Sequence, residues 1–447
     1  MNDSRKTDDW HTGPTVFAFQ AAGPDPHSFD ELTYFTADDE VAALASLSGG
    51  PRLALIAVTI ATSILLLLVT LAMTPKPADE LPTAAPSPWG IVWAWGANDV
   101  GQLGQGSYDI ILDTVRVPEL AGAIMVSAGS GHSMALREDG TVWTWGSNKA
   151  GQLGDGTKVY RSRPDKAAVD GIVQITSGDF HNVAVAKDGS VWTWGFNGSG
   201  QAVGEEEHMR LTPYRVPGLP PVVAAAAGAT FSAALTADGE VWAWGGNSQG
   251  ALGRGRLGGV AYVPVQVLGL PHIVAITAGS HHLLAVDEHG DVWAWGSNRG
   301  GQLGDGTLMD RPSPVRVEGI ADVVEVAGGM YYSLARTRDG HVWAWGRHGV
   351  RLDDDPLGQL ESHPAPNLIP ILRGATAIAG GAFEAMVLKE DGSVWGWRVP
   401  FPPNGAGFSR LPNFPVQVNG VREAGAVAVG MGHALIVERK ASSIPAS

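Results

Sequence analysis

The sequence predicts an all-β fold: a seven-bladed β-propeller closed by pairing of its first and last strands and preceded by one transmembrane helix. Three observations predict it: a tryptophan motif that occurs seven times, Asp-Gly pairs before most of its copies, and a 21-residue apolar segment near the N-terminus. A repeat of about fifty residues is typical of a propeller blade. The 60 glycines and 16 tryptophans in 447 residues also indicate one repetitive architecture rather than several unrelated domains.

The motif Val-Trp-x-Trp-Gly begins first at Val92, and its last copy, at Val394, ends in arginine. Tryptophans two residues apart lie on the same face of a strand, so the motif predicts a bulky face that packs on the neighbouring blade. All but two of the 16 tryptophans belong to the motif, and we predict that they are structural: Trp93, Trp95, Trp143, Trp145, Trp192, Trp194, Trp242, Trp244, Trp293, Trp295, Trp343, Trp345, Trp395 and Trp397.

Hairpin signals precede the motif. Asp139-Gly140 and four similar pairs lie between two apolar runs, which predicts a tight hairpin with a type I′ turn. A Pro-Val-x-Val run and a run that leads into a glycine complete four strands per repeat. The first motif has no strand before it, and the last strand, from His433, has no motif after it. Pairing of these two would close the ring and remove exposed edges.

The chain divides into five predicted segments. Residues 1–52 are acidic and predicted to be disordered, residues 53–73 (Leu53–Met73) form an uncharged span as long as a bilayer core is thick, and residues 74–88 form a linker with five prolines. The propeller follows at 89–440 and a short tail at 441–447. A short tail before a first span usually stays in the cytoplasm, so we expect a single-pass protein of the cell membrane with an extracytoplasmic propeller.

The repeat resembles the regulator of chromosome condensation repeat. Val-Trp-x-Trp-Gly is followed by Asn-x-x-Gly-Gln-Leu-Gly-Asp-Gly-Thr, and Gly-x-x-His-Ser-x-Ala-Leu precedes the Asp-Gly pair. The resemblance covers roughly Trp89 to Lys440 and implies a seven-bladed propeller. It implies no single activity, because the family includes a guanine-nucleotide exchange factor, a plant UV-B photoreceptor and a bacterial β-lactamase inhibitor.

Composition excludes several functions. A net charge of −15 argues against nucleic acid as a partner, and the absence of cysteine excludes disulfides, thiolate zinc sites and cysteine nucleophiles. Ser248 lies in a Gly-x-Ser-x-Gly sequence, but that sequence falls in a repeat loop with no helix after it, unlike a nucleophile elbow. The glycine-rich loops lack the lysine and helix of a P-loop. We expect no cofactor, no metal and no catalytic residue.

One position per blade carries polar or aromatic side chains: His132, His181, Phe231, His282, Tyr332, Glu384 and His433. Four histidines and a glutamate suggest a metal ring, but equivalent points of different blades are held apart, whereas a metal needs ligands within about 2.2 Å. We therefore expect structural or channel-mouth roles. If the channel hosted a hydrolase, Glu384 would be its carboxylate.

The repeat breaks down in the loops of the sixth and seventh copies. Loops on a rigid scaffold often bind partners, so we predict a binding patch there. Drift of unconstrained surface loops is the alternative, and the three aspartates lack EF-hand spacing for calcium. The predicted patch comprises Arg347, His348, Arg351, Asp353, Asp354, Asp355, Phe401 and Phe408.

These features favour a membrane-anchored, non-enzymatic propeller that binds an unidentified protein or cell-surface ligand outside the cytoplasm. The main alternative is a guanine-nucleotide exchange factor-like regulator of a small GTPase, which requires a cytosolic propeller. An extracytoplasmic hydrolase that uses the propeller channel is a further alternative. Light sensing by the tryptophans is the weakest, because fourteen of them lie at packing positions.

Overall fold

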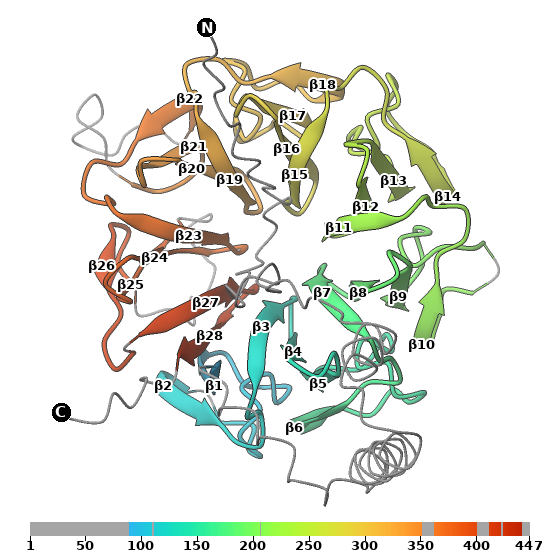
Figure 1. The fold of residues 1–447 in the computed structure, drawn as a ribbon, viewed down its shortest axis with the longest axis vertical. Coiled ribbons are helices and arrows are strands. Elements are labelled where there is room, and N and C mark those ends of the chain that lie inside the picture. Colours follow the sequence, from blue (N-terminus) through green and yellow to red (C-terminus); the bar gives the residue numbers. More distant parts are fainter. Residues whose placement is uncertain are drawn as a thin grey trace, which may run out of the picture. The chain divides into compact units, whose positions relative to one another are not determined.

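The computed structural model describes residues 89–109, 111–205, 207–350, 362–399, 411–421 and 423–439. Within these residues the protein is all β, with seven four-stranded antiparallel sheets arranged as blades around a central channel (Figure 1). The predicted seven-bladed propeller is therefore confirmed. In the described ranges no helix is long and apolar enough to cross a membrane. The apolar segment Leu53–Met73 lies outside those ranges, as do the tail, the linker and residues 441–447.

Each blade is numbered by its tryptophan motif and has four strands from the channel outward. The innermost strands are β3 (Ala123–Ala128), β7 (Ile172–Ser177), β11 (Val222–Ala227), β15 (Ile273–Ala278), β19 (Val323–Gly328), β23 (Ala375–Gly380) and β27 (Ala424–Val429). The second strands are β4 (His132–Arg137), β8 (His181–Ala186), β12 (Phe231–Thr236), β16 (His282–Asp287), β20 (Tyr332–Thr337), β24 (Glu384–Lys389) and β28 (His433–Arg439). The third strands carry the motif and are β1 (Trp89–Gly96), β5 (Val142–Gly146), β9 (Val191–Phe196), β13 (Val241–Gly246), β17 (Val292–Gly296), β21 (Val342–Gly346) and β25 (Val394–Arg398). The outermost strands are β2 (Ile111–Val117), β6 (Arg161–Lys166), β10 (Met209–Arg215), β14 (Val260–Gln266), β18 (Arg311–Arg316), β22 (His363–Leu368) and β26 (Val416–Gln417).

Blade 1 closes the ring with strands from both ends of the propeller. Its strand order is β2-β1-β28-β27, and β1 pairs with β28 from Trp89 opposite Arg439 to Gly96 opposite His433. The predicted closure is thus confirmed. It satisfies main-chain groups that would otherwise be exposed on two edges of the domain.

The two ends of the blades carry different connections. Loops between the first and second strands and between the third and fourth strands share one end of the ring, which we call the loop face. The Asp-Gly turns and the links between blades share the other end, the turn face. Strand β1 starts and β28 ends at the turn face.

The hairpin at Asp139-Gly140 corrects the predicted turn type. Arg137 N donates to Thr141 O (3.0 Å) and Arg137 O accepts from Gly140 N (2.9 Å), so the loop has three residues. Gly140 has a φ of 78°, whereas Asp139 is not among the residues with positive φ. A type I′ turn needs positive φ at both central residues, so that prediction is wrong. The Asp139 carboxylate instead accepts from Thr141 N (3.0 Å) and Oγ1 (2.6 Å), which fixes a type I turn followed by a left-handed glycine.

The tryptophans join neighbouring blades. In every motif the first ring is half-buried and the second is buried, and in six of the seven motifs both rings belong to the same interblade core. Six of the buried rings also donate Nε1–H to a main-chain oxygen of the preceding blade, which ties the packing to one register. These bonds run from Trp145 to Gln102 (2.8 Å), Trp194 to Gln152 (2.9 Å), Trp244 to Gln201 (2.9 Å), Trp295 to Ala251 (2.9 Å), Trp345 to Gln302 (2.8 Å) and Trp397 to His348 (2.9 Å).

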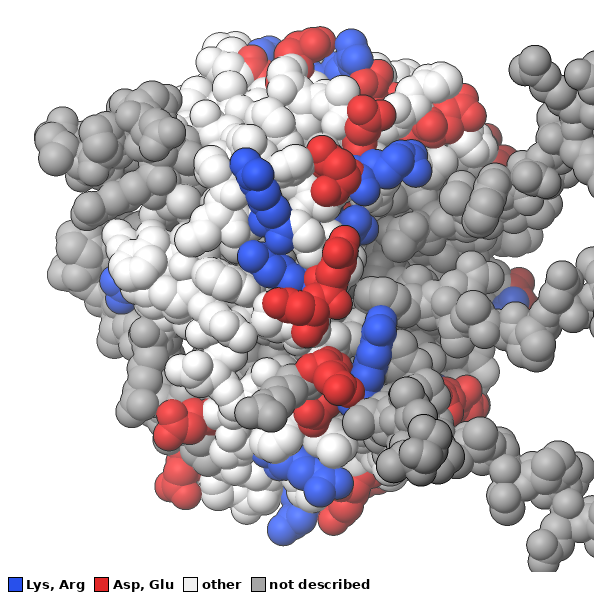
Figure 2. Space-filling view, turned by 60° about the vertical axis from the view of Figure 1, so that its left-hand side comes forward, with Lys and Arg blue, Asp and Glu red and all other residues white. Residues whose placement is uncertain are grey.

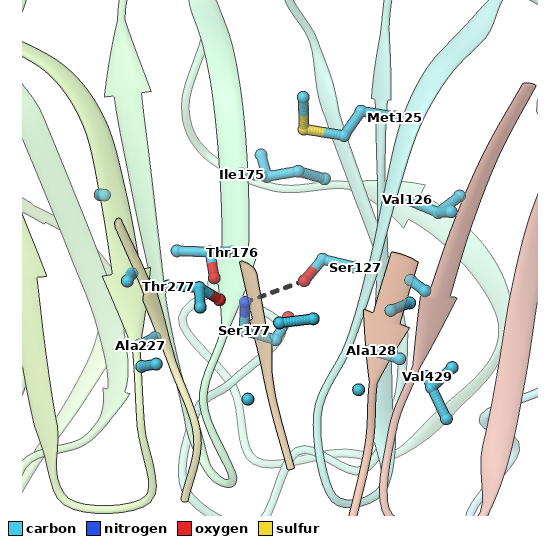
Figure 3. Close-up of a pocket in the computed structure, with 18 of the residues that line it drawn as sticks. Met125, Val126, Ser127, Ala128, Ile175, Thr176, Ser177, Ala227, Thr277 and Val429 are labelled. Carbon is cyan, nitrogen blue, oxygen red and sulfur yellow. Dashed lines mark hydrogen bonds between the residues drawn. The ribbon is translucent and has the colours of Figure 1, made fainter. Parts of the chain in front are cut away.

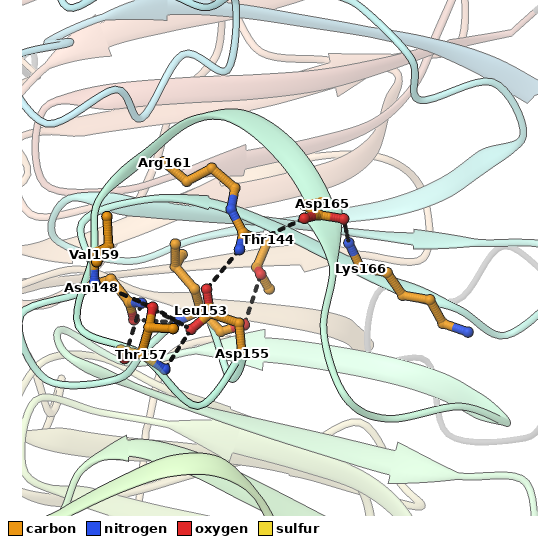
Figure 4. Close-up of polar contacts among 9 residues, drawn as sticks. All are labelled: Thr144, Asn148, Leu153, Asp155, Thr157, Val159, Arg161, Asp165 and Lys166. Carbon is orange, nitrogen blue, oxygen red and sulfur yellow. Dashed lines mark hydrogen bonds and ion pairs between the residues drawn. The ribbon is translucent and has the colours of Figure 1, made fainter.

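The glycine-rich loop after the motif holds the next blade's outer strand. In blade 2, Asn148 Oδ1 accepts from Leu153 N (2.9 Å), while Asp155 accepts from Thr157 N (2.9 Å) and from the Arg161 guanidinium (2.6 Å) (Figure 4). A glycine N–H of the folded loop then reaches a main-chain oxygen of the following blade. Such bonds run from Gly106 to Ser162 (2.7 Å), Gly156 to Leu211 (2.9 Å), Gly204 to Tyr262 (2.9 Å), Gly255 to Pro312 (2.8 Å) and Gly306 to Pro364 (2.9 Å).

Candidate functional site

The central channel is narrow and lined by small side chains. Its wider part has a volume of about 110 Å³ and is walled by residues such as Ser127, Thr176, Ala227 and Thr277 from the innermost strands (Figure 3). Ser177 N donates to Ser127 Oγ (2.9 Å) across the joint between blades 2 and 3. None of the described residues that line this part is charged. It therefore offers no pair of carboxylates for hydrolysis.

At the loop face the channel ends in a mouth with a volume of about 80 Å³, formed by the loops between the first and second strands. Asp179 is the one charged residue among the described residues that line it. Burial without a counter-charge raises the pKa of Asp179 to about 6. The loops around it are joined by main-chain bonds such as Ser130 N to Asp179 O (3.1 Å). Asp179 is thus a fixed, poorly solvated carboxylate at an opening.

Aromatic and basic side chains lie on the loop face, next to but not among the residues that line the mouth. Phe180 follows Asp179 and is 46% exposed, and Tyr331 holds the equivalent position in blade 6. The guanidinium carbon of Arg347 lies 5.9 Å from the centre of the Tyr331 ring. Burial, with a contribution from the Arg299 charge, lowers the pKa of His281 at the same position of blade 5. Rigid aromatic rings and arginines are the residues that most often carry protein–protein binding energy.

The polar position noted in every blade is the first residue of the second strand, and it lies between blades. All seven side chains are 5% exposed or less. Each histidine there contacts the next blade through Nε2: His132 with Asn182 Oδ1 (2.7 Å), His181 with Ser232 Oγ (2.8 Å), His282 with Ser333 Oγ (2.9 Å) and His433 with Ser133 Oγ (2.9 Å). Tyr332 donates to Glu384 O (2.8 Å). These contacts support the structural role, and in the ranges that the structure describes no three His, Asp or Glu side chains are placed to hold a metal.

The hydroxyl partners fix the histidine tautomer. Ser133 donates to Gln102 O (2.8 Å), so its oxygen accepts from Nε2–H of His433. Nδ1 of His433 then carries no proton and has no partner. Glu384 is buried between blades, at the same position as these histidines, and does not line the channel. The geometric support for a hydrolase that uses Glu384 is therefore removed.

Two residues of the predicted binding patch can be placed. Arg347 lies half-buried in the loop after β21, over the Tyr331 ring. His348 is buried at the sequence position that asparagine has in other blades. Its Nδ1 accepts from Val350 N (3.2 Å), and its ring lies 4.9 Å from that of His363. The rest of the patch lies outside the described residues and stays a prediction: Arg351, Asp353, Asp354, Asp355, Phe401 and Phe408.

Sequence reasoning missed Asp179, Phe180, His281 and Tyr331. Their signal is the variable pair within Gly-x-x-His, which differs in every repeat although its flanking residues are regular.

The charged side chains on the surface of the propeller are of mixed sign. On the side of the propeller in Figure 2, Lys and Arg side chains alternate with Asp and Glu and do not gather into a basic patch. The described residues on that side therefore form no continuous basic stripe that would suit a phosphate backbone.

The fold and mouth define a class of protein. The family model described as "RCC1-like domain" matches residues 91–436, which is most of the chain. The chain therefore belongs to the RCC1-like propeller family, and the resemblance inferred from the repeat is confirmed.

Solved structures agree at the level of fold. Yeast RCC1 (Prp20), in its crystal structure bound to Kap60, is similar with a TM-score of 0.69 and 23% sequence identity, over 80% of this chain and 90% of that one. Prp20p of Saccharomyces cerevisiae, reported with its binding properties to Gsp1p and histones, gives 0.67 and 22%, over 80% and 93%. Human WBSCR16 gives 0.69 and 21%, over 78% and 99%.

The family corrects the main functional prediction. A membrane-anchored module that binds a surface ligand outside the cytoplasm was expected, but the matching family and the similar structures are RCC1 proteins. They favour the alternative of an exchange factor-like regulator. The yeast relatives bind proteins, which agrees with protein binding as the general role and gives no support to a cell-surface ligand.

Proposed function

We propose that the chain is a guanine-nucleotide exchange factor-like regulator that binds a small GTPase at the mouth on the loop face. Membership of the RCC1-like family carries this proposal. Yeast Prp20p is known to bind the GTPase Gsp1p. Such a regulator acts through binding free energy alone, so it requires no covalent catalysis and no cofactor from this chain.

The mouth is suited to a folded protein partner. The Asp179 carboxylate is already desolvated in the unbound protein. A cationic side chain of the partner can therefore pair with it without a further desolvation penalty for the carboxylate. Phe180, next to Asp179, and Tyr331, on the equivalent loop of blade 6, supply rigid aromatic side chains on the same face. The loops that carry them are hydrogen-bonded to one another, which lowers the entropy lost on association.

Replacing the carboxylate by an amide is expected to abolish most exchange activity. Asp179→Asn keeps the shape of the mouth and removes its charge, so it should slow release of a fluorescent GDP analogue from the responsive GTPase by on the order of 10- to 100-fold. Asp170→Asn, an exposed carboxylate on the turn face, is the matched control. Stopped-flow release should be measured with the full-length chain against a panel of purified small GTPases. Acceleration of none of them, or equal acceleration by both variants, would contradict the proposal.

Exchange on a small GTPase also requires the propeller to face the cytoplasm, opposite to the orientation expected from the short N-terminal tail. Ser248 is an exposed loop residue, and the chain has no cysteine. A Ser248→Cys variant in intact cells should therefore resist a membrane-impermeant maleimide and react only after lysis. Labelling of intact cells would place the propeller outside and exclude an intracellular GTPase as its partner.

A further inference from the structure

One link between blades on the turn face has an asparagine where the others do not. Four links begin Val-x-Gly, and the glycine has a positive φ in each: Gly218 (76°), Gly269 (83°), Gly319 (84°) and Gly420 (85°). Glycine adopts this conformation without strain. The residue before the glycine is Pro217, Leu268 or Glu318 in three links, and it is Asn419 in the link from β26 to β27 (Figure 1). The turn therefore requires the glycine but not the asparagine.

The reactive groups of this Asn-Gly pair are accessible. Asn419 and Gly420 are both exposed to solvent. Within the part of the chain that the structure describes, neither the side-chain amide of Asn419 nor the main-chain N–H of Gly420 makes a hydrogen bond. A Cβ atom at Gly420 would lie 2.7 Å from Thr114 Oγ1, which gives a second reason for glycine at this position. No side chain at residue 420 therefore hinders contact between its nitrogen and the Asn419 amide.

The other Asn-Gly pair among the described residues, Asn197-Gly198, is protected. Asn197 is 2% exposed. Its Oδ1 accepts from Ala202 N (2.8 Å), and its Nδ2 donates to the main-chain oxygens of Val203 (3.1 Å), Gly204 (2.9 Å) and Glu207 (2.7 Å). Rotation of the side chain toward Gly198 N would break these bonds. The molecule thus contains the same dipeptide in an accessible and in a protected setting.

We propose that Asn419 is a site of spontaneous deamidation, with water as the co-reactant. Gly420 N attacks Asn419 Cγ: the N–Cγ bond forms, the Cγ–Nδ2 bond breaks, and the amide nitrogen leaves as ammonia with the proton from Gly420 N. Water then opens the succinimide ring that results. Opening at Cγ gives aspartate, and opening at the main-chain carbonyl carbon of residue 419 gives isoaspartate. Either product adds a negative charge to the turn face.

Isoaspartate also lengthens the main chain by one atom at the joint that closes the ring. The link is held at both ends, by bonds from Val418 N to Val394 O (2.8 Å) and from Ala424 N to Gly392 O (3.1 Å). Val418 and Val421 are buried in the core between blade 7 and blade 1. An extra main-chain atom between fixed ends displaces these valines from a close-packed core, which lowers stability. Deamidation should therefore weaken the closure of the propeller.

Peptide mapping tests the site directly. The full-length chain in mild detergent is incubated at physiological temperature and mildly alkaline pH, which favours loss of the main-chain amide proton, and is then digested with trypsin. Cleavage after Arg410 and Arg422 separates Asn419 from Asn197 and from Asn404, whose Asn-Gly pair lies outside the described residues. Asn419 should deamidate faster than Asn197 by on the order of ten-fold or more, because a buried amide reacts only after local opening. Equal rates at these two sites, or an Asn419 that keeps its amide, would overturn the proposal.

Asn419→Glu separates the added charge from the added main-chain atom. Glutamate holds the equivalent position in the link between blades 5 and 6, as Glu318, and it does not form the five-membered ring. Incubation should lower the Tm of the native chain by on the order of 2 °C and leave that of Asn419→Glu unchanged. An equal loss in both chains would contradict the effect on closure. This chemistry does not depend on nucleotide exchange, so the two proposals fail or stand separately.

Discussion

Lowering the pH from about 7.5 to about 5 is expected to remove most of the stability of the propeller. Burial lowers the pKa of His132 to about 4 and those of His181, His282, His348 and His433 to about 3, from an ordinary value of 6.5. Below pH 6.5 the unfolded chain binds a proton at each of these residues, whereas the folded chain does not until pH 3 to 4. Folding stability is therefore complete above pH 6.5 and is lost as the pH falls through this window.

The expected loss is large compared with the stability of a domain. Each histidine contributes about 2 kcal/mol between pH 6.5 and 5, and five contribute on the order of 10 kcal/mol, comparable with the whole free energy of unfolding of a typical domain. Asp179 and Glu325 act in the opposite direction, because burial raises the pKa of each carboxyl and so favours the protonated folded state, but they are two groups against five. Denaturant titrations followed by tryptophan fluorescence at several pH values measure the effect. A midpoint that is constant from pH 7.5 to 5 would contradict it.

The molecule contains a natural control for one joint. Where other blades place histidine against serine or asparagine, Phe231 packs in one core with Leu283 of the next blade. The double variant His433→Phe/Ser133→Leu copies this apolar joint. It should match the native chain at pH 7.5 and lose about 2 kcal/mol less at pH 5.

The Ser133→Leu single variant shows whether the two residues are coupled. It removes the hydroxyl that accepts from Nε2–H of buried His433 and should lose about 1–3 kcal/mol at neutral pH. Gln102 O stays bonded to Trp145 Nε1 (2.8 Å), so the loss belongs to the histidine. Additive effects of the two single changes would show that they are not coupled.

Arg336→Val is expected to lower the free energy of unfolding by about 3–5 kcal/mol. Arg336 Nε donates to Glu325 Oε2 (2.7 Å) inside the joint between blades 6 and 7, and the Glu325 side chain is 6% exposed. Its other oxygen accepts from Ile378 N (3.3 Å). Removing the arginine leaves a buried carboxylate without a counter-charge, which costs more than the ion pair contributes. Thermal and denaturant unfolding at neutral pH measure the loss.

The equivalent joint between blades 3 and 4 shows how to restore this stability. There Gln174 lies opposite Val185, the positions of Glu325 and Arg336. Its amide bonds Ala225 N and O at 2.9 Å each. Glu325→Gln/Arg336→Val should therefore recover most of the lost stability. A double variant as unstable as Arg336→Val would show that the ion pair itself, rather than satisfaction of the buried groups, holds the joint.

The ring could be predicted from sequence because its signals are local and repeated. A tryptophan pair at strand spacing, a turn and a fixed period each specify short-range geometry, and their agreement in seven copies leaves one architecture. Closure by β1 and β28 was predictable for the same reason, since each end lacks the strand that the other supplies. The turn type was not, because Asp-Gly is compatible with both two-residue and three-residue hairpin loops. The Asp139–Thr141 hydrogen bonds decide between them.

The site depended on tertiary structure. Asp179 and Phe180 of blade 3 are far apart in sequence from Tyr331 of blade 6, and they lie on one face only because the ring brings equivalent loops together. Closure of the ring also buries the histidines between neighbouring blades, where desolvation lowers the pKa of each one. Short sequence motifs do not predict the distance between residues of different blades or the degree to which a carboxylate is buried. The sequence by itself therefore determined the blade and the number of blades. Only the closed ring decided which side chains face the channel mouth and which are buried between blades, because both depend on contacts between segments that are distant in sequence.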